Sequence, residues 1–381
     1  MRIIVAPDSY KGSISALGVA EAMERGIKSV FPQAEVIKVP IADGGEGTVE
    51  ALVCSSGGVF RKTNVIGPLG EPVEASWGIL GDGVTAVVEM AAASGLTLLP
   101  KDKRNPLLAG TFGTGQLVSE VLNKGLRRLI LGIGGSATND GGVGFASALG
   151  IRFLDADGKD LPQGGASLIK LAGIDLSRAD ARLHDLEITV ACDVDNPLCG
   201  PRGATAIFGP QKGVTGTMLP QLDAALAHYA KIAAEATGRN IADKAGAGAA
   251  GGLGAGILFF TEARLRPGID IVLDTLNFRR LAAEADLVIT GEGNSDRQTA
   301  YGKAPVGVAK AAKEHGVPVI CLSGGLSEGY QQIFEQGIDA AGACLCAPMS
   351  VEECMAEGAA LVQYAAERLC RILRVGKSLP K

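Results

Sequence analysis

Short apolar runs, each followed by a polar, glycine-bearing loop and a helical pattern, constrain the fold of this chain more than any other feature. The run 3–6 leads into the polar loop 7–12 and then into an amphipathic pattern over 13–31. A second predicted strand at 36–40 leads into another loop and helix in the same order. Uninterrupted apolar runs are typical of parallel strands buried on both faces. The order predicts a parallel sheet with helices on both faces.

The length of the chain predicts two domains, because its 381 residues exceed the ~250–300 at which a single core stops growing. Strand and helix patterns alternate strictly from 285 on, whereas 63–90 has the pattern of hairpin strands. The predicted fold class is α/β, a doubly wound parallel sheet domain with a second, mixed α/β domain inserted in it. The predicted ranges are 1–60, 105–150 and 285–381 for the first domain and 61–104 and 151–284 for the inserted one.

Composition argues against several classes of function. The net charge is −5, whereas nucleic-acid-binding proteins usually carry a basic face, so no nucleic-acid partner is expected. The eight cysteines form no Cys-x-x-Cys pair and there are three histidines, so we expect no structural zinc and a reducing compartment. No signal-peptide pattern and no uninterrupted apolar stretch of ~18 residues is present, so we expect a cytoplasmic protein without a membrane partner.

Polar loops follow the first two predicted strands, at the edge where open α/β sheets bind ligands. A carboxylate there can hold Mg²⁺ or accept a proton, an ammonium group can hold a phosphate, and consecutive glycines expose backbone N–H groups. Ordinary capped turns with solvated charges are the alternative for both loops. The candidates in these loops are Asp8, Ser9, Lys11, Asp43, Gly44, Gly45 and Glu46.

A third loop, over 132–142, follows a buried strand and precedes a helical pattern. Its glycines allow the backbone to close on a phosphate, and a helix N-terminus would add positive potential. Part of it, Gly132-x-Gly134-x-x-Ala137, also resembles a dinucleotide-binding fingerprint. The candidates in this loop are Gly134, Gly135, Ser136, Thr138, Asn139 and Asp140.

A fourth loop, over 291–305, is denser in charge than a structural loop requires. It follows a strand pattern and carries Glu292, Asp296, Arg297 and Lys303. The carboxylates could hold a metal, and the cations could meet phosphate or a substrate carboxylate.

Two further positions draw attention outside these loops. Asp193 follows a strand pattern and is a metal or base candidate, although an ordinary turn would also suit it. Lys212 is expected in an exposed polar turn.

Taken together and in chain order, the loops resemble the class I glycerate kinases. The resemblance spans nearly the whole chain, which makes it far more specific than any single loop. The segments that carry it are APDSYKGSISA, VPIADGGEGTVEA, VIGPLG, EMAAASGL, GTGQL, LGIGGSATNDGG, ACDVDNPLCG, FGPQKG, GAGAAGGLGAG, ITGEG and GKAPVGVA.

This resemblance implies a flavodoxin-like domain with an inserted α/β domain, and an enzyme that phosphorylates D-glycerate with ATP and Mg²⁺. Bacterial members generally yield 2-phosphoglycerate, usually in glyoxylate or sugar-acid metabolism. Members often carry an Arg and an apolar residue where this chain has Asn294 and Ser295, and Tyr10 replaces a usual Phe. Glycerate is the expected partner, and a homo-oligomer is left open.

For such a kinase, catalysis is positioning plus stabilisation of the charge on the transferring phosphoryl group. We expect Mg²⁺ on one or more of Asp43, Glu46, Asp193 and Asp296. A carboxylate of Asp8, Asp193 or Asp296 would orient the acceptor hydroxyl.

Cations and backbone amides are expected to hold the anionic groups. Lys11, Arg297 and Lys303 would meet the glycerate carboxylate or the transferring phosphate, with Gln298 beside them. The loop 134–142 would donate N–H groups to a phosphate.

The hypothesis requires the loops around 11, 43, 136 and 296 to converge on one cleft, with the inserted domain closing over it. Two alternatives stay open on the sequence. One is a nicotinamide-dependent oxidoreductase that uses 132–137, and the other is a non-enzymatic sugar-acid-binding protein.

Overall fold

The computed structural model describes residues 1–378, which divide into two compact units. Unit 1 comprises Met1–Asp43, Glu50–Ser56 and the chain from Ile269 on, and unit 2 comprises Gly44–Val49 and Gly57–Gly268. The chain therefore passes between the units four times.

The sheet of unit 1 has five strands that are all parallel. Its order across the sheet is β15-β13-β11-β1-β2. Numbered along this unit, the order is 2-1-3-4-5, which is the flavodoxin-like order. The predicted doubly wound parallel sheet is therefore confirmed. The strands are β1 (Arg2–Pro7), β2 (Glu35–Lys38), β11 (Leu287–Gly291), β13 (Val319–Ser323) and β15 (Ala340–Ala343).

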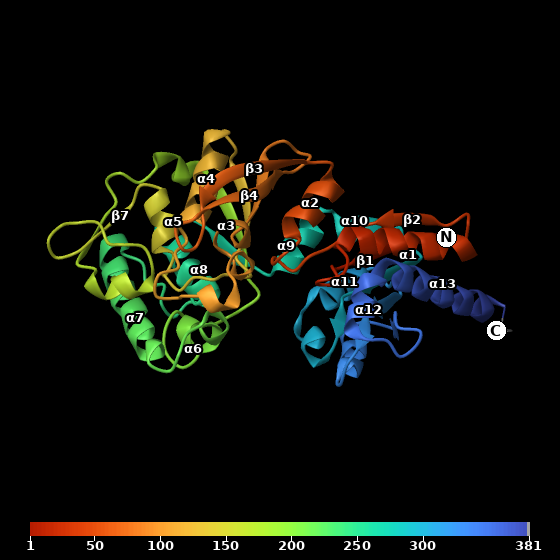
Figure 1. Ribbon diagram of the computed structural model, residues 1–381. Helices are drawn as coiled ribbons and strands as arrows, with labels where there is room; N and C mark the ends of the chain where they lie inside the picture. Colours follow the sequence, from red (N-terminus) through yellow and green to blue (C-terminus); the bar gives the residue numbers. More distant parts are fainter. Residues whose placement is uncertain (379–381) are drawn as a thin grey trace. The chain divides into compact units, whose positions relative to one another are not determined.

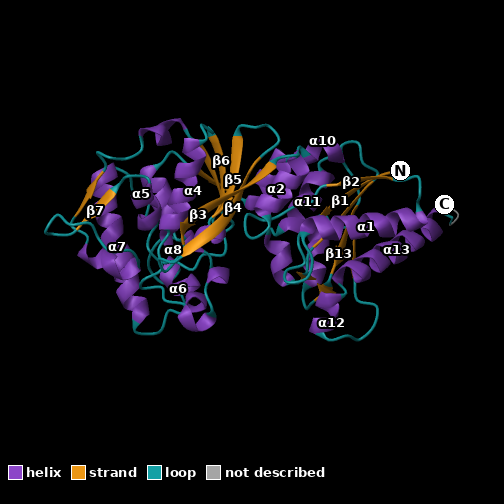
Figure 2. Cartoon of the chain, turned by 45° about the horizontal axis from the view of Figure 1, so that its top comes forward, coloured by secondary structure: helices purple, strands orange, loops and turns teal. Residues whose placement is uncertain are grey.

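Helices α1 (Ala16–Val30) and α13 (Gly358–Lys377) lie side by side and cover one face of this sheet (Figures 1 and 2). The side chain of Ser15 caps α1 by accepting a hydrogen bond from the backbone N–H of Gly18. The apolar face of α1 is buried between the strands and α13, as its 3.6-residue period predicts. The remaining helices of unit 1 are α9 (Gly268–Thr275), α10 (Phe278–Ala282), α11 (Ala304–Lys313) and α12 (Val351–Ala356), and α2 (Thr48–Ser56) begins in unit 2 and ends in unit 1.

Unit 2 contains a six-stranded mixed sheet in the order β10-β9-β6-β5-β4-β3. Within unit 2, strands β3, β4 and β5 form the antiparallel hairpins that the sequence predicts over 63–90. The other three pair in parallel. The strands are β3 (Val59–Ile66), β4 (Pro72–Ile79), β5 (Thr85–Glu89), β6 (Arg128–Gly132), β9 (Glu187–Ala191) and β10 (Arg264–Arg266), and β7 (Arg152–Leu154) with β8 (Gly173–Asp175) forms a small antiparallel pair.

Helices pack on this sheet around an apolar core of its own, separate from that of unit 1. The glycine- and alanine-rich run near 250 becomes a helix with a kink at Ala250–Gly252. A side chain at Gly251 would lie 1.9 Å from the carbonyl oxygen of Thr138, so only glycine fits this approach. The helices are α3 (Ala91–Ser94), α4 (Phe112–Asn123), α5 (Val143–Ala148), α6 (Ala204–Phe208), α7 (Met218–Thr237) and α8 (Ala249–Phe260).

The division into units differs from the ranges that the sequence pattern suggests. The pattern assigns 105–150 to the first domain, whereas β6 pairs with β5 and β9 in the sheet of unit 2. The pattern also assigns 269–284 to the inserted domain, whereas these residues lie in unit 1, where Ile269 packs against Gly307 of α11. Both differences arise from long-range pairing, which local patterns do not reveal.

Within residues 1–378, no helix combines the length and the apolarity needed to cross a bilayer.

Candidate active site

The strand order of unit 1 places a topological switch point between β1 and β11. These strands are adjacent and parallel, with Pro7 in register with Gly291, and the loops that follow them lead to opposite faces of the sheet. In open α/β sheets the crevice at this point, at the carboxyl ends of the strands, is the usual ligand site.

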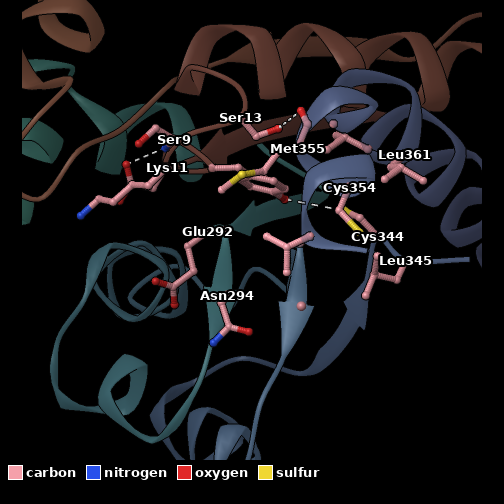
Figure 3. Close-up of a pocket in the computed structure, with 18 of the residues that line it drawn as sticks. Ser9, Lys11, Ser13, Glu292, Asn294, Cys344, Leu345, Cys354, Met355 and Leu361 are labelled. Carbon is pink, nitrogen blue, oxygen red and sulfur yellow. Dashed lines mark hydrogen bonds between the residues drawn. The ribbon is translucent and has the colours of Figure 1, made fainter. Parts of the chain in front are cut away.

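A cavity of about 620 Å³ opens at these strand ends in unit 1. The loops after β1, β11, β13 and β15 all line it, together with α12 and the start of α13. Figure 3 shows Lys11, Glu292 and Asn294 on one side, and Cys344, Leu345, Cys354 and Leu361 on the other. The cavity thus has a charged end and an apolar end.

Asp8 is the most strongly perturbed acid of the charged end. Its side chain is 7% exposed, and it accepts a hydrogen bond of 2.6 Å from the backbone N–H of Ser9. Burial, followed by the negative charge of Asp43, raises the pKa of Asp8 to about 7. A carboxyl group with this pKa exchanges its proton near neutral pH, as a catalytic acid or base must.

Glu292 lies at the centre of a hydrogen-bonded cluster. Its Oε1 accepts hydrogen bonds from the hydroxyl of Thr299 at 2.6 Å and from that of Ser295 at 3.3 Å. Lys303 Nζ lies 3.7 Å from Glu292 Oε2 and 3.6 Å from Asp296 Oδ1. Burial raises the pKa of Glu292, and the hydrogen bond from Thr299 and the positive charge of Lys303 oppose that rise. Ser295, one of the two departures from the family pattern, is therefore a buried support for Glu292.

Asp296 lines the cavity and also stabilises a turn of the loop. Its carboxylate caps the 3₁₀ turn Arg297–Tyr301 by accepting hydrogen bonds from the N–H groups of Gln298 and Thr299. Arg297 and Gln298 lie on that turn and do not line the cavity. Asn294, the other departure, does line the cavity and accepts a hydrogen bond from Ser327.

The third loop, in unit 2, uses its polar side chains internally. Asp140 is buried and accepts hydrogen bonds from the N–H and hydroxyl groups of Thr111 and from the N–H groups of Gly142 and Gly144. Its carboxylate thus occupies the N-terminal amides of α5, where the sequence suggests a phosphate site. Asn139 donates a hydrogen bond to Thr205, also inside the unit.

Lys212 stabilises the same loop through hydrogen bonds from its side chain. The turn that carries it is expected at the surface, but the Lys212 side chain is 1% exposed. Its Nζ donates 2.7 Å hydrogen bonds to the Ser136 hydroxyl and to the Thr138 carbonyl. Burial lowers the pKa of Lys212 to about 7. The turn composition gave no sign of this burial, although the FGPQKG segment of the family pattern contains the residue.

The Gly44–Glu46 segment packs against the strand ends of unit 2. A side chain at Gly44 would lie 2.5 Å from Ala191 Cβ, and one at Gly134 would lie 3.0 Å from Gly45 Cα, so close packing requires these glycines. Glu89, at the end of β5, accepts a 2.7 Å hydrogen bond from Val49.

Burial raises the pKa of Glu89 to about 7, and the charge of Glu46 adds to the rise. Glu89 was not among the sequence candidates, although its place at a strand end marks it. Asp193 accepts a hydrogen bond from the N–H of Gly268.

The structure thus sorts the sequence candidates into three groups. The candidates that line the cavity of unit 1 are Asp8, Ser9, Lys11, Asp43, Glu292, Asp296 and Lys303. Those in unit 1 outside its lining are Arg297 and Gln298. Those in unit 2 are Gly44, Gly45, Glu46, Gly134, Gly135, Ser136, Thr138, Asn139, Asp140 and Asp193.

The convergence expected for residues near 11, 43 and 296 is therefore present in unit 1. The part that Ser136 was expected to play stays a prediction. The dinucleotide fingerprint lacks its context, since α5 begins at Val143, six residues after Ala137, and not within the motif.

Comparisons with known proteins agree on one family. The profile of the Glycerate kinase family matches residues 3–374. A glycerate kinase of Bacillus subtilis (strain 168) is 52% identical over 379 residues, covering 100% of this chain and 99% of that protein. A glycerate 2-kinase of Escherichia coli (strain K12) is 51% identical over 340 residues, with 89% of each chain covered.

A solved structure extends this similarity to three dimensions. A crystal structure of a protein assigned as glycerate kinase 2 from Salmonella typhimurium LT2 superimposes with a TM-score of 0.91 at 47% identity, and all of each chain is covered.

Proposed function

This chain belongs to the glycerate kinase family, and from that membership we propose that it transfers the γ-phosphoryl group of ATP to D-glycerate, giving 2-phosphoglycerate and ADP. The choice of the 2-hydroxyl follows the similarity to the Escherichia coli glycerate 2-kinase.

The observation that carries the proposal is the cavity at the β1/β11 switch point. Ligands of doubly wound sheets bind at this position, and here the loops place Asp8, Lys11 and Lys303 around one space. An acid whose pKa is about 7 beside two ammonium groups suits the transfer of a charged group to a hydroxyl.

We assign a separate role in the reaction to each of the charged residues that line the cavity. Asp8 orients the acceptor hydroxyl and takes its proton as the new P–O bond forms, while the bond to the ADP leaving group breaks. Lys11 and Lys303 bind the anionic oxygens, where they stabilise the charge that develops during transfer. Glu292 and Asp296 hold Lys303 in place through the contacts of 3.7 and 3.6 Å.

Mg²⁺ fits the donor set of this cavity. Four carboxylates, those of Asp8, Asp43, Glu292 and Asp296, face two lysines in the lining, so a polyphosphate would be repelled unless a cation came with it. Residues 1–378 contain no group of three or more ligands able to hold a metal alone, which suits Mg²⁺, since it usually takes one or two carboxylates plus substrate phosphates. Asp43, which the sequence also suggests as a metal ligand, would hold it, which leaves Asp8 free to accept the proton, and when bound Mg²⁺ would neutralise phosphate charge.

Coupled measurement of ADP release with D-glycerate, ATP and Mg²⁺ tests the proposal, and phosphorus NMR of the product identifies the esterified hydroxyl. We expect turnover that EDTA abolishes and excess Mg²⁺ restores, with 2-phosphoglycerate as the product. Absence of glycerate-dependent ADP release by folded protein would refute the proposed reaction. A 3-phosphoglycerate signal would refute only the choice of hydroxyl.

A further inference from the structure

The apolar end of the unit 1 cavity has no role in the chemistry described above. It is lined by Leu345, Met349, Val351, Met355 and Leu361, from the segment after β15 and from helices α12 and α13. We refer to these five side chains as the apolar wall. Ser13, which also lines this region, donates its hydroxyl to the carbonyl of Met355 and so fixes the end of α12 against the first loop.

Several members of the wall are exposed to an unusual degree. Leu345 is 43% exposed, Val351 67% and Met355 43%. Single exposed apolar side chains are ordinary on protein surfaces, but here three of them face one cavity together with buried neighbours. An apolar ligand surface would remove this exposed area from water.

The proposed substrates contain one group that matches such a wall. Glycerate is a three-carbon acid with two hydroxyls, so all of it demands polar partners, as do the ribose and the triphosphate of ATP. The adenine ring is flat and largely apolar on its faces. Thioether side chains adapt to ring faces and make favourable sulfur–aromatic contacts, and the wall holds two methionines.

We propose that the apolar wall is the adenine-binding subsite, so that unit 1 holds the nucleotide with its base against α12 and α13 and its phosphates toward Lys11 and Lys303. The inference rests on the proposed function for the identity of the nucleotide. It assigns the two ends of one cavity to the two ends of ATP, since the charged end carries both lysines and the carboxylates that suit Mg²⁺. The cavity volume of about 620 Å³ lies within the ~300–1,000 Å³ of small-molecule sites.

Methyl NMR on the full-length protein tests the subsite without using activity. The chain has six methionines, so ¹³C-methyl labelling gives a short spectrum, in which Met349→Leu and Met355→Leu variants identify the two wall signals. We expect ADP with Mg²⁺ to shift both wall signals through the ring current of the base. The buried Met23 and the Met218 of unit 2 serve as internal references, and D-glycerate alone should leave the wall signals in place.

A charge placed in the wall gives the second measurement. We expect Val351→Glu to raise the Kd of ADP, measured by calorimetry, at least about tenfold, because a carboxylate would be buried against the base. The matched control is Ile372→Glu on α13, which places the same charge on a side chain that is 69% exposed and outside the cavity lining. The control should bind ADP as the unaltered protein does. Because Val351 is exposed, its replacement should leave the fold intact, which circular dichroism checks.

The outcomes separate the inference from the proposed reaction. If the unaltered protein binds ADP but neither wall methyl shifts and Val351→Glu binds ADP normally, the subsite is refuted even if glycerate is phosphorylated. If no glycerate-dependent ADP release occurs but both wall methyls shift with ADP, the reaction is refuted and the nucleotide subsite stands.

Discussion

At the scale of single residues, the burial that gives Asp8 a pKa suited to catalysis also lowers the stability of the folded protein at neutral and higher pH. Its pKa is raised from 3.8 to about 7, so the folded protein binds a proton that the unfolded chain releases between these pH values. The free energy of unfolding therefore falls as pH rises through this window, and above about pH 7 the full penalty of the buried charge is present. A penalty of this kind is typical of functional sites.

We expect Asp8→Asn to lose activity by about 10²–10⁴-fold, the usual contribution of a general base, while its stability at pH 8 equals or exceeds that of the unaltered protein. In the unaltered enzyme, kcat/KM should rise with pH up to about 7, because the carboxylate is the active form. Rate profiles and urea denaturation at pH 5 and pH 8 give both quantities. Retained activity would remove Asp8 from the mechanism, and a large loss of stability at pH 8 would contradict the raised pKa.

Lys212 has a structural role, since its amino group is buried and hydrogen-bonded within unit 2. We expect Lys212→Met to lower the free energy of unfolding by about 1–3 kcal/mol, because the Ser136 hydroxyl and the Thr138 carbonyl would lose their donor. The exposed Lys101→Met variant should change it by less than about 0.5 kcal/mol. Urea denaturation of both variants measures the two changes in the free energy of unfolding. Equal changes would mean that Lys212 contributes no more to stability than a surface lysine does.

At the scale of elements, helices α1 and α13 approach each other at Gly26. A side chain there would lie 2.3 Å from the carbonyl oxygen of Gln363 and 2.8 Å from Ala366 Cβ. Helix propensity alone favours alanine by about 1 kcal/mol. The backbone carbonyl cannot move away as a flexible side chain could, so the steric cost of overpacking should exceed the gain in helix propensity.

We expect Gly26→Ala to lower the free energy of unfolding by about 1–2 kcal/mol. In Gly376→Ala, near the end of α13, no atom of residues 1–378 outside the helix's own backbone and the two chain neighbours lies within 4 Å of the added methyl group, so the propensity gain should appear and stability should hold or rise. Thermal denaturation of the pair separates packing from propensity. A stabilising Gly26→Ala would show that the helices can move apart at little cost.

Local patterns predicted most elements because their period and their end signals agree with the final packing. The N-terminal helix, Ala16–Val30, falls within the amphipathic pattern over 13–31, and the hairpin strands of unit 2 fall where alternation predicts them. Asp8, Lys11 and Glu292, which line the charged end of the cavity, were candidates on the sequence because they stand in polar loops directly after apolar runs.

What local patterns missed depends on contacts between distant segments. The place of β6 is decided by its pairing with β5 and β9. The burial of Lys212 depends on a loop some seventy residues away, as its bonds to Ser136 and Thr138 show. The apolar wall has no motif, since Val351 and Met355 belong to a short, acidic helix that indicates a surface element.

At the scale of the whole molecule, each unit has its own sheet and its own apolar core. Units of this kind usually open separately in hydrogen exchange, so a ligand slows exchange first in the unit that holds it. A ligand that binds only the native state at a hundred times its Kd stabilises that state by about 2.7 kcal/mol, enough to slow linked exchange about a hundredfold.

We therefore expect ADP with Mg²⁺ to slow amide exchange in 8–13, 292–296 and 344–355, three of the segments that line the cavity of unit 1. Amides of β7 and β8 in unit 2 should exchange at unchanged rates. Mass spectrometry of peptides from the intact protein, with and without ADP, measures both sets in one experiment. Protection confined to 134–142 would instead place the nucleotide in unit 2 and contradict the assignment of the cavity, because the segments that line it would then gain nothing from binding.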